Sequence, residues 1–121
     1  MSDAVRDIAG RRVLVCAPDG PPVRGEREAV DIIGQALGEG ASWVALPGAR
    51  LGDGFLTLST RIAGEVIQKF VNYRIDLAIV GDISAQLAAS KPLRDFVYES
   101  NKGRHVWFVA DLAELETRLR A

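Results

Sequence analysis

One stretch near the middle of the chain, residues 55–82, constrains the fold more than any other. Its sequence is FLTLSTRIAGEVIQKFVNYRIDLAIVGD. Apolar side chains recur there at intervals of three and four residues from Ile62 to Val71, which predicts an amphipathic helix with one face in the core. From Ile75 to Val80 the apolar residues are nearly continuous, which is typical of a strand covered on both faces. A helix that leads through a tight turn into a buried strand indicates an α/β fold.

The start of this helix offers two hydroxyl side chains, Ser59 and Thr60. A hydroxyl at a helix start accepts a hydrogen bond from a backbone N–H that has no partner within the helix. We therefore expect one of the two to cap the helix, and the sequence does not choose between them.

Similar patterns predict the remaining elements in the order strand, strand, helix, strand, helix, strand, helix, strand, helix. A β-hairpin is expected at about residues 5–17. The other expected elements are helices at 26–38, 90–103 and 111–120 and strands at 43–46 and 105–110. Ser90 is expected to cap one of these helices, and Asp111 with Glu114 to form a capping box at another.

Strands that are separated by single helices pair in parallel, and the hairpin adds an antiparallel edge. The sequence therefore predicts one α/β domain over residues 1–121, with a single-layer, mixed, mostly parallel sheet of about five strands flanked by about four helices. Residues 18–25, PDGPPVRG, are rich in proline and glycine, so we expect a loop there that is the most mobile part of the chain. Residues 83–89 are expected to be a connection or a weak helical turn.

Composition and charge argue against several classes of function. Fifteen basic and sixteen acidic side chains give a net charge of −1, so nucleic acid is not expected as the main partner, because phosphate neutralisation needs a basic excess. Cys16 is the only cysteine and His105 the only histidine, so no disulfide, metal or cofactor is expected, and Cys16 is predicted to be buried. No apolar run reaches the ~20 residues that span a bilayer. We expect a cytoplasmic protein without a membrane partner.

Two segments of the chain carry a recognisable pattern, LSTRIAGEVIQKFVNYRIDLAIVGD and SKPLRDFVYESNKGRHVWFV. They resemble a bacterial family known as domain of unknown function 4180. That family has the pattern FF-x-L-x-T-x-x-AGE-x-LQKF-x-NY followed by LAIVGD, and later SK-x-LRDF-x-x-E-x-N-x-G. The chain is therefore identified as a member of the family. This resemblance implies a bacterial source and no particular activity.

More distantly, the hairpin and the order of helices and strands resemble the sulfate-transporter and anti-sigma-factor-antagonist (STAS) domain. That domain carries a D-S-S-G-L loop whose serine lies at a helix start and can be phosphorylated by a partner kinase. The resemblance places this serine at Ser59 or Thr60. Leu58 stands where the acidic residue of the motif would be, and Arg61 where its glycine would be.

The two edges of the predicted sheet carry the candidate site residues. Parallel sheets bind ligands at the carboxyl ends of their strands, and the predicted elements place Asp19, Asp53, Asp82 and Lys91 near that edge. Carboxylates gathered on one edge could hold Mg²⁺. The alternative is structural, since an aspartate such as Asp82 also stabilises a turn or a following helix start.

The opposite edge carries a basic patch that also contains an amide. Its residues are Asn72, Arg74, Lys102, Arg104 and His105. It is either an anion or partner-docking site, or a set of cations that the helix dipole favours at helix C-termini. No serine or cysteine nucleophile stands at a suitable spacing from His105, so no catalytic residue is expected.

These features favour a non-enzymatic regulatory or protein-interaction module of STAS-like shape. Its protein partner would meet residues 52–61, with Ser59, Thr60 and Arg61 in contact. The alternative is a small-molecule-binding protein or small enzyme, which needs a deep pocket with converging polar groups at the carboxyl edge. A shallow edge and an exposed apolar patch at the start of the central helix would favour the module. The partner's identity stays open, and so does a homodimer.

Overall fold

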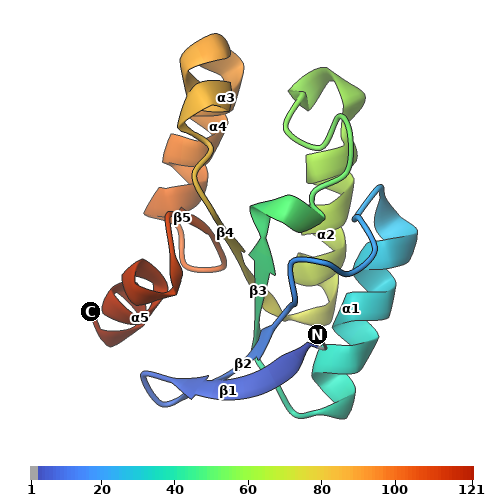
Figure 1. Ribbon diagram of the computed structural model, residues 1–121, viewed down its shortest axis with the longest axis vertical. Coiled ribbons are helices and arrows are strands. Elements are labelled where there is room, and N and C mark those ends of the chain that lie inside the picture. Colours follow the sequence, from blue (N-terminus) through green and yellow to red (C-terminus); the bar gives the residue numbers. More distant parts are fainter. Residues whose placement is uncertain (1–2) are drawn as a thin grey trace.

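The computed structural model describes residues 3–121, which are arranged around one five-stranded sheet (Figure 1). The strands are β1 (Ala4–Ile8), β2 (Arg11–Val15), β3 (Trp43–Pro47), β4 (Asp76–Val80) and β5 (Val106–Val109). They lie side by side in chain order. β1 is antiparallel to β2, and each later strand is parallel to the one before it. The predicted α/β class with a mixed, mostly parallel sheet is confirmed.

Helices connect the parallel strands and follow the last one. They are α1 (Glu26–Gly38), α2 (Ile62–Tyr73), α3 (Ser84–Ala89), α4 (Lys91–Lys102) and α5 (Leu112–Arg120), with short 3-10 helices η1 (Gly48–Arg50) and η2 (Leu58–Thr60). The segment predicted as a connection or weak turn thus forms α3, so the described chain has five α-helices where about four were expected. Six residues complete fewer than two helical turns, so α3 is too short to show a helical period in the sequence.

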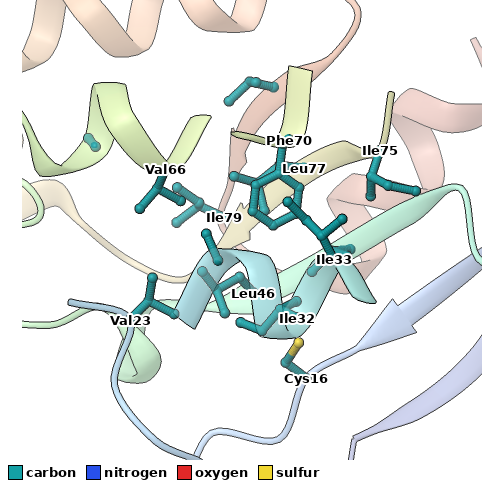
Figure 2. Packing of buried hydrophobic residues seen from close by; sticks show 14 of the residues in the cluster. Cys16, Val23, Ile32, Ile33, Leu46, Val66, Phe70, Ile75, Leu77 and Ile79 are labelled. Carbon is teal, nitrogen blue, oxygen red and sulfur yellow. The ribbon is translucent and has the colours of Figure 1, made fainter. Parts of the chain in front are cut away.

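The larger core lies between the sheet and helices α1, α2 and α4. Val66 and Phe70 of α2 pack in one cluster with Leu77 and Ile79 of β4, and Figure 2 shows these side chains together with those of α1 and β3. All four are at most 1% exposed. The predicted central unit, an amphipathic helix that leads into an interior strand, is therefore confirmed.

The opposite face of the sheet is covered by α5. Leu115 and Leu119 pack there with Val13, Trp43 and Trp107. The two tryptophan rings are 4.8 Å apart between centroids. A single helix of nine residues thus closes this face, and it does so near the amino ends of the strands.

Two predicted helix starts are confirmed by their hydrogen bonds. The Ser90 hydroxyl accepts a bond of 3.2 Å from the backbone N–H of Leu93. Asp111 accepts one of 2.8 Å from the N–H of Glu114, whose carboxylate accepts one of 2.7 Å from the N–H of Ala110. Both caps supply partners for backbone donors that have none within their helix.

Arg50 joins the loop after β2 to the loop after β3. Its side chain is 4% exposed. The guanidinium donates hydrogen bonds to the carbonyls of Pro21, at 2.7 Å, and Ala17, at 3.0 Å, and lies 3.5 Å from the carboxylate of Asp3. A Cβ at Gly20 would lie 2.5 Å from this guanidinium, so a larger residue there would push the guanidinium away from its present position.

Backbone contacts strengthen the same junction. Val23 forms a bridge with Leu51. Its N–H donates to the carbonyl of Arg50 at 2.6 Å, and its own carbonyl accepts from Gly52 at 3.0 Å. The loop at residues 18–25, which the sequence predicts to be the most mobile, is therefore held in place by two buried residues, Val23 and Arg50. The sequence did not indicate this, because the residues that meet are more than twenty-five positions apart.

We expect the Arg50→Ala variant to unfold about 3 kcal/mol more easily than the wild type, because two carbonyls lose a charged donor. Chemical denaturation followed by circular dichroism measures this difference. Arg24→Ala is the matched control, since Arg24 lies exposed in the same loop and should change the free energy of unfolding by less than about 0.5 kcal/mol. Equal effects from both variants would contradict the role of Arg50.

Candidate functional site

The loops after β3 and β4 form the carboxyl edge of the sheet, at the top of Figure 1. Asp53 and Asp82 line one open hollow of about 470 Å³ between these loops. The other two predicted residues of this edge lie elsewhere. Lys91 pairs with Asp95 on its own helix at 2.8 Å, and Asp19 does not line the hollow. The structure thus brings two of the four predicted residues together.

Asp82 has a structural role at the start of α3. Its carboxylate accepts a hydrogen bond of 2.9 Å from the backbone N–H of Ser84. Hydrogen bonds from the side chain and backbone of Ser84 lower the pKa of Asp82, so this exposed carboxylate is ionised at neutral pH. Within residues 3–121, no group of three or more histidine, cysteine or acidic side chains could hold a metal ion.

Two neighbouring hydroxyls in the loop that leads into α2, those of Ser59 and Thr60, have different environments. The Thr60 hydroxyl lies 2.7 Å from the carbonyl of Gly54 and 2.8 Å from that of Thr57, and it accepts a bond of 3.3 Å from the N–H of Ile62. Ser59 is exposed, and its hydroxyl makes no hydrogen bond in the described part of the chain. Thr60 therefore closes the loop, whereas Ser59 is available to a partner.

Arg61 is the residue immediately before α2, and its backbone is left-handed, with φ 66° and ψ 5°. This conformation costs a non-glycine residue about 1–2 kcal/mol. The STAS motif has a glycine at this position, and glycine adopts such a conformation without that cost. The N-cap of α2 is thus Arg61 rather than Ser59 or Thr60, although Thr60 still accepts a bond from the first helical N–H.

A second open hollow, of about 350 Å³, lies between this loop and the start of α4. Leu56, Leu58 and Ser59 line it on the loop side, and Pro92 and Leu93 on the helix side. It shares three lining residues with the hollow at Asp53 and Asp82, namely Leu56, Thr57 and Gln86. The two hollows form one shallow depression along the carboxyl edge, which we call the carboxyl-edge groove.

An exposed apolar patch at the start of α2 is the feature that would favour the module. Leu56 and Leu58 are partly buried rather than exposed. The exposed large apolar side chains of the described chain lie elsewhere: Val30, Leu37, Val71, Tyr73 and Tyr98. The carboxyl-edge groove therefore has partly buried apolar side chains among its lining, and an exposed apolar patch is not found at the start of α2 within residues 3–121.

The predicted basic patch at the opposite edge is divided. Arg74 and His105 line a hollow of about 380 Å³, and His105 with Arg104 lines a neighbouring one of about 470 Å³. Asn72 instead accepts a hydrogen bond from Gln68 at 2.8 Å, and Lys102 pairs with Glu99 at 3.4 Å. These last two side chains have partners on their own helices.

Sequence analysis missed several residues of this edge. Asp76 lines both hollows and lies 2.7 Å from Nδ1 of His105. Arg11, Trp43 and Arg118 line the larger hollow. A signal was present for three of them, because Arg11, Trp43 and Asp76 each begin a strand of the parallel part of the sheet, and the amino ends of such strands meet at one edge.

Cys16 is buried, as predicted, with 3% of its surface exposed. Burial, with a smaller contribution from the charge of Asp3, raises the pKa of its thiol from 9.0 to about 12. The thiolate is the reactive form of cysteine, so Cys16 is not a nucleophile at neutral pH.

We expect iodoacetamide to alkylate Cys16 slowly in the folded protein and rapidly in urea at about pH 8, as mass spectrometry would show.

The raised pKa of Cys16 also makes the free energy of folding depend on pH. The folded state keeps its thiol proton up to pH about 12, whereas the unfolded chain loses it near 9.0, so stability falls as pH rises between these values. The Cys16→Ala variant should lack this component of the fall, and identical slopes would contradict the assignment.

Substitution of the two loop hydroxyls should change the free energy of unfolding by different amounts. Thr60→Val keeps the shape of the side chain but removes its hydrogen bonds, so we expect a loss of about 1–2 kcal/mol in thermal or chemical unfolding. Ser59→Ala should change stability by less than about 0.5 kcal/mol, because the hydroxyl is exposed and unbonded. A larger effect at Ser59 would reverse the assignment.

Comparison with known proteins places most of the chain in one family. The family model described as Domain of unknown function (DUF4180) matches residues 8–119. Neither the curated proteins nor the solved structures give a match. Within the described residues, the helices are all too short or too polar to cross a bilayer.

Proposed function

This chain belongs to the DUF4180 family, and on the geometry of its carboxyl edge we propose that it is a non-enzymatic regulatory module that binds a partner protein there. The loop at residues 52–61 is the contact surface. Ser59 and Arg61 are the polar contacts, and the carboxyl-edge groove receives an apolar side chain of the partner.

The observation that carries this proposal is the placement of Ser59. Its exposed hydroxyl has no partner within residues 3–121, and it borders a hollow lined by Leu56, Leu58 and Pro92. Protein interfaces combine an apolar centre with a polar rim in this way. Thr60 holds the loop closed from within, so the surface is preorganised for a partner.

The left-handed backbone at Arg61 supports the same surface. A strained, exposed residue beside a helix start persists only where its surroundings hold it, and such residues cluster at sites of recognition. Arg61 is exposed and directly follows the loop that Thr60 closes. It therefore presents a cation two residues along the chain from Ser59.

Phosphorylation of Ser59 would regulate this surface without unfolding it. A phosphate brings a charge of about −2, and the N-terminus of a helix favours negative charge. Ser59 lies three residues before Ile62, where α2 begins. The modification would thus leave α2 intact while reversing the charge that the partner meets.

A second candidate function is supported by Asp53 and Asp82, which line one hollow. Two carboxylates without a lysine or arginine among the lining residues suit a cationic or polyhydroxylated small molecule. No histidine or cysteine of the described chain lines this hollow, so binding is favoured over catalysis. Asp53→Asn would weaken such binding.

Affinity capture with variants tests the main proposal. The immobilised wild-type protein should retain a partner from a native lysate, and Ser59→Glu and Arg61→Glu should each reduce the retained amount at least about tenfold, because each introduces a negative charge at the contact surface and so changes its electrostatic complementarity with the partner. Arg6→Glu is the control, since Arg6 lies exposed on β1, away from the groove. Ser59→Ala should still bind.

Two outcomes would contradict the proposal. One is that the wild type retains no protein. The other is that Ser59→Glu, Arg61→Glu and Arg6→Glu all retain the same proteins in equal amounts.

A further inference from the structure

A hollow of about 470 Å³ at the amino edge of the sheet gathers positive charge. Three guanidinium groups line it, from Arg11 at the start of β2, Arg104 before β5 and Arg118 on α5. Asp76 is the acidic side chain at this hollow, and it lies 2.7 Å from His105. We call this region the amino-edge hollow.

Two of these cations have no partner in the described chain. The side chains of Arg11 and Arg104 are exposed and make no hydrogen bond or ion pair within residues 3–121. Arg118 is held in place, because it donates a hydrogen bond of 2.6 Å to the carbonyl of Asn101 and lies 4.2 Å above the ring of Trp107. One ordered and two unpaired guanidinium groups therefore share one hollow with the Asp76 carboxylate and with Ala121, the last residue of the sequence.

The remaining wall of the hollow is aromatic. Trp43 and Trp107 both line it, and they are 2% and 8% exposed. The Trp107 indole N–H donates a bond of 2.8 Å to the carbonyl of Gly103. The Trp43 indole N–H is buried and has no acceptor among the residues that the structure describes. Buried donors rarely lack a partner, and Trp43 is a residue of this hollow whose polar atom is left unsatisfied within the described chain.

We propose that the amino-edge hollow binds a small organic anion, namely a phosphate or carboxylate group attached to an aromatic or apolar body. The planar guanidinium of arginine matches the oxygens of both groups. The indole rings offer apolar surface to the body of the ligand. The volume falls in the range of about 300–1,000 Å³ that small-molecule sites occupy.

This site lies at the opposite edge of the sheet from the groove at Ser59. The residues that line the two regions do not overlap. Anion binding therefore neither requires nor excludes the partner protein proposed for the carboxyl edge, and each proposal can fail alone.

NMR of the two tryptophan side chains tests the proposal on the full chain. Trp43 and Trp107 are the only tryptophans, so ¹H–¹⁵N spectra contain two indole N–H signals, and both report on this hollow. Phenyl phosphate, benzoate, inorganic phosphate and phenol are the probes. We expect phenyl phosphate or benzoate to shift the indole signals saturably, with a Kd at least about tenfold below that of phenol, because phenol lacks the charge that arginine binds.

The comparison of phenyl phosphate with benzoate shows which head group the site prefers. The comparison of phenyl phosphate with inorganic phosphate shows how much the aromatic body contributes, and we expect the inorganic ion to bind more weakly. A Kd for both aromatic anions equal to that of phenol would overturn the proposal, as would shifts that do not saturate.

Arginine variants locate the binding site. Arg11→Gln and Arg104→Gln should each raise the Kd for the better-bound aromatic anion at least about fivefold, since each removes one charged donor, without lowering the melting temperature. Arg27→Gln is the matched control, because Arg27 is exposed on the first turn of α1 and does not line the hollow. The proposal fails if all three variants bind the anion as the wild type does.

Discussion

The structure depends above all on the burial of one face of α2 against β4. Val66 and Phe70 meet Leu77 and Ile79 in the larger core, where all four side chains are removed from water. Each such side chain contributes about 1.5–3 kcal/mol of hydrophobic free energy. Because β4 is hydrogen-bonded to β3 and β5, this contact places the helix relative to the whole parallel part of the sheet. It also positions both candidate surfaces, since α2 begins beside the Ser59 loop and ends beside the basic edge.

The strand order separates two kinds of surface. Because β2, β3, β4 and β5 are parallel, their carboxyl ends lie at one edge of the sheet and their amino ends at the other. The carboxyl edge receives the long loops, which Thr60 and Arg50 fix by hydrogen bonds to backbone carbonyls. The amino edge receives short connections and the end of α5, which bring arginines together beside two tryptophans. The carboxyl edge thus presents loops of fixed conformation, and the amino edge presents positively charged side chains.

Arginine has three different roles in this fold, and burial explains the difference. Arg50 is buried and holds two loops together through hydrogen bonds to neutral carbonyls, so its charged group is not accessible to a ligand. Arg118 is half-buried over Trp107, where its position is fixed but one side remains open. Arg11 and Arg104 are exposed and without partners in the described chain, and only such side chains are available for an external anion.

The sequence by itself determined the class of the fold, the central helix and strand, the helix caps at Ser90 and Asp111, and the burial of Cys16. Each follows from neighbours within a few residues, through periodicity or a local hydrogen bond. Only the tertiary structure decided that Thr60 rather than Ser59 is bonded, that Arg50 holds the loop after β2, and that Arg11 and Arg118 share a hollow. The last two outcomes depend on contacts between residues far apart in the chain, and the first depends on how the loop at residues 54–60 closes on itself. A pattern along the sequence contains neither.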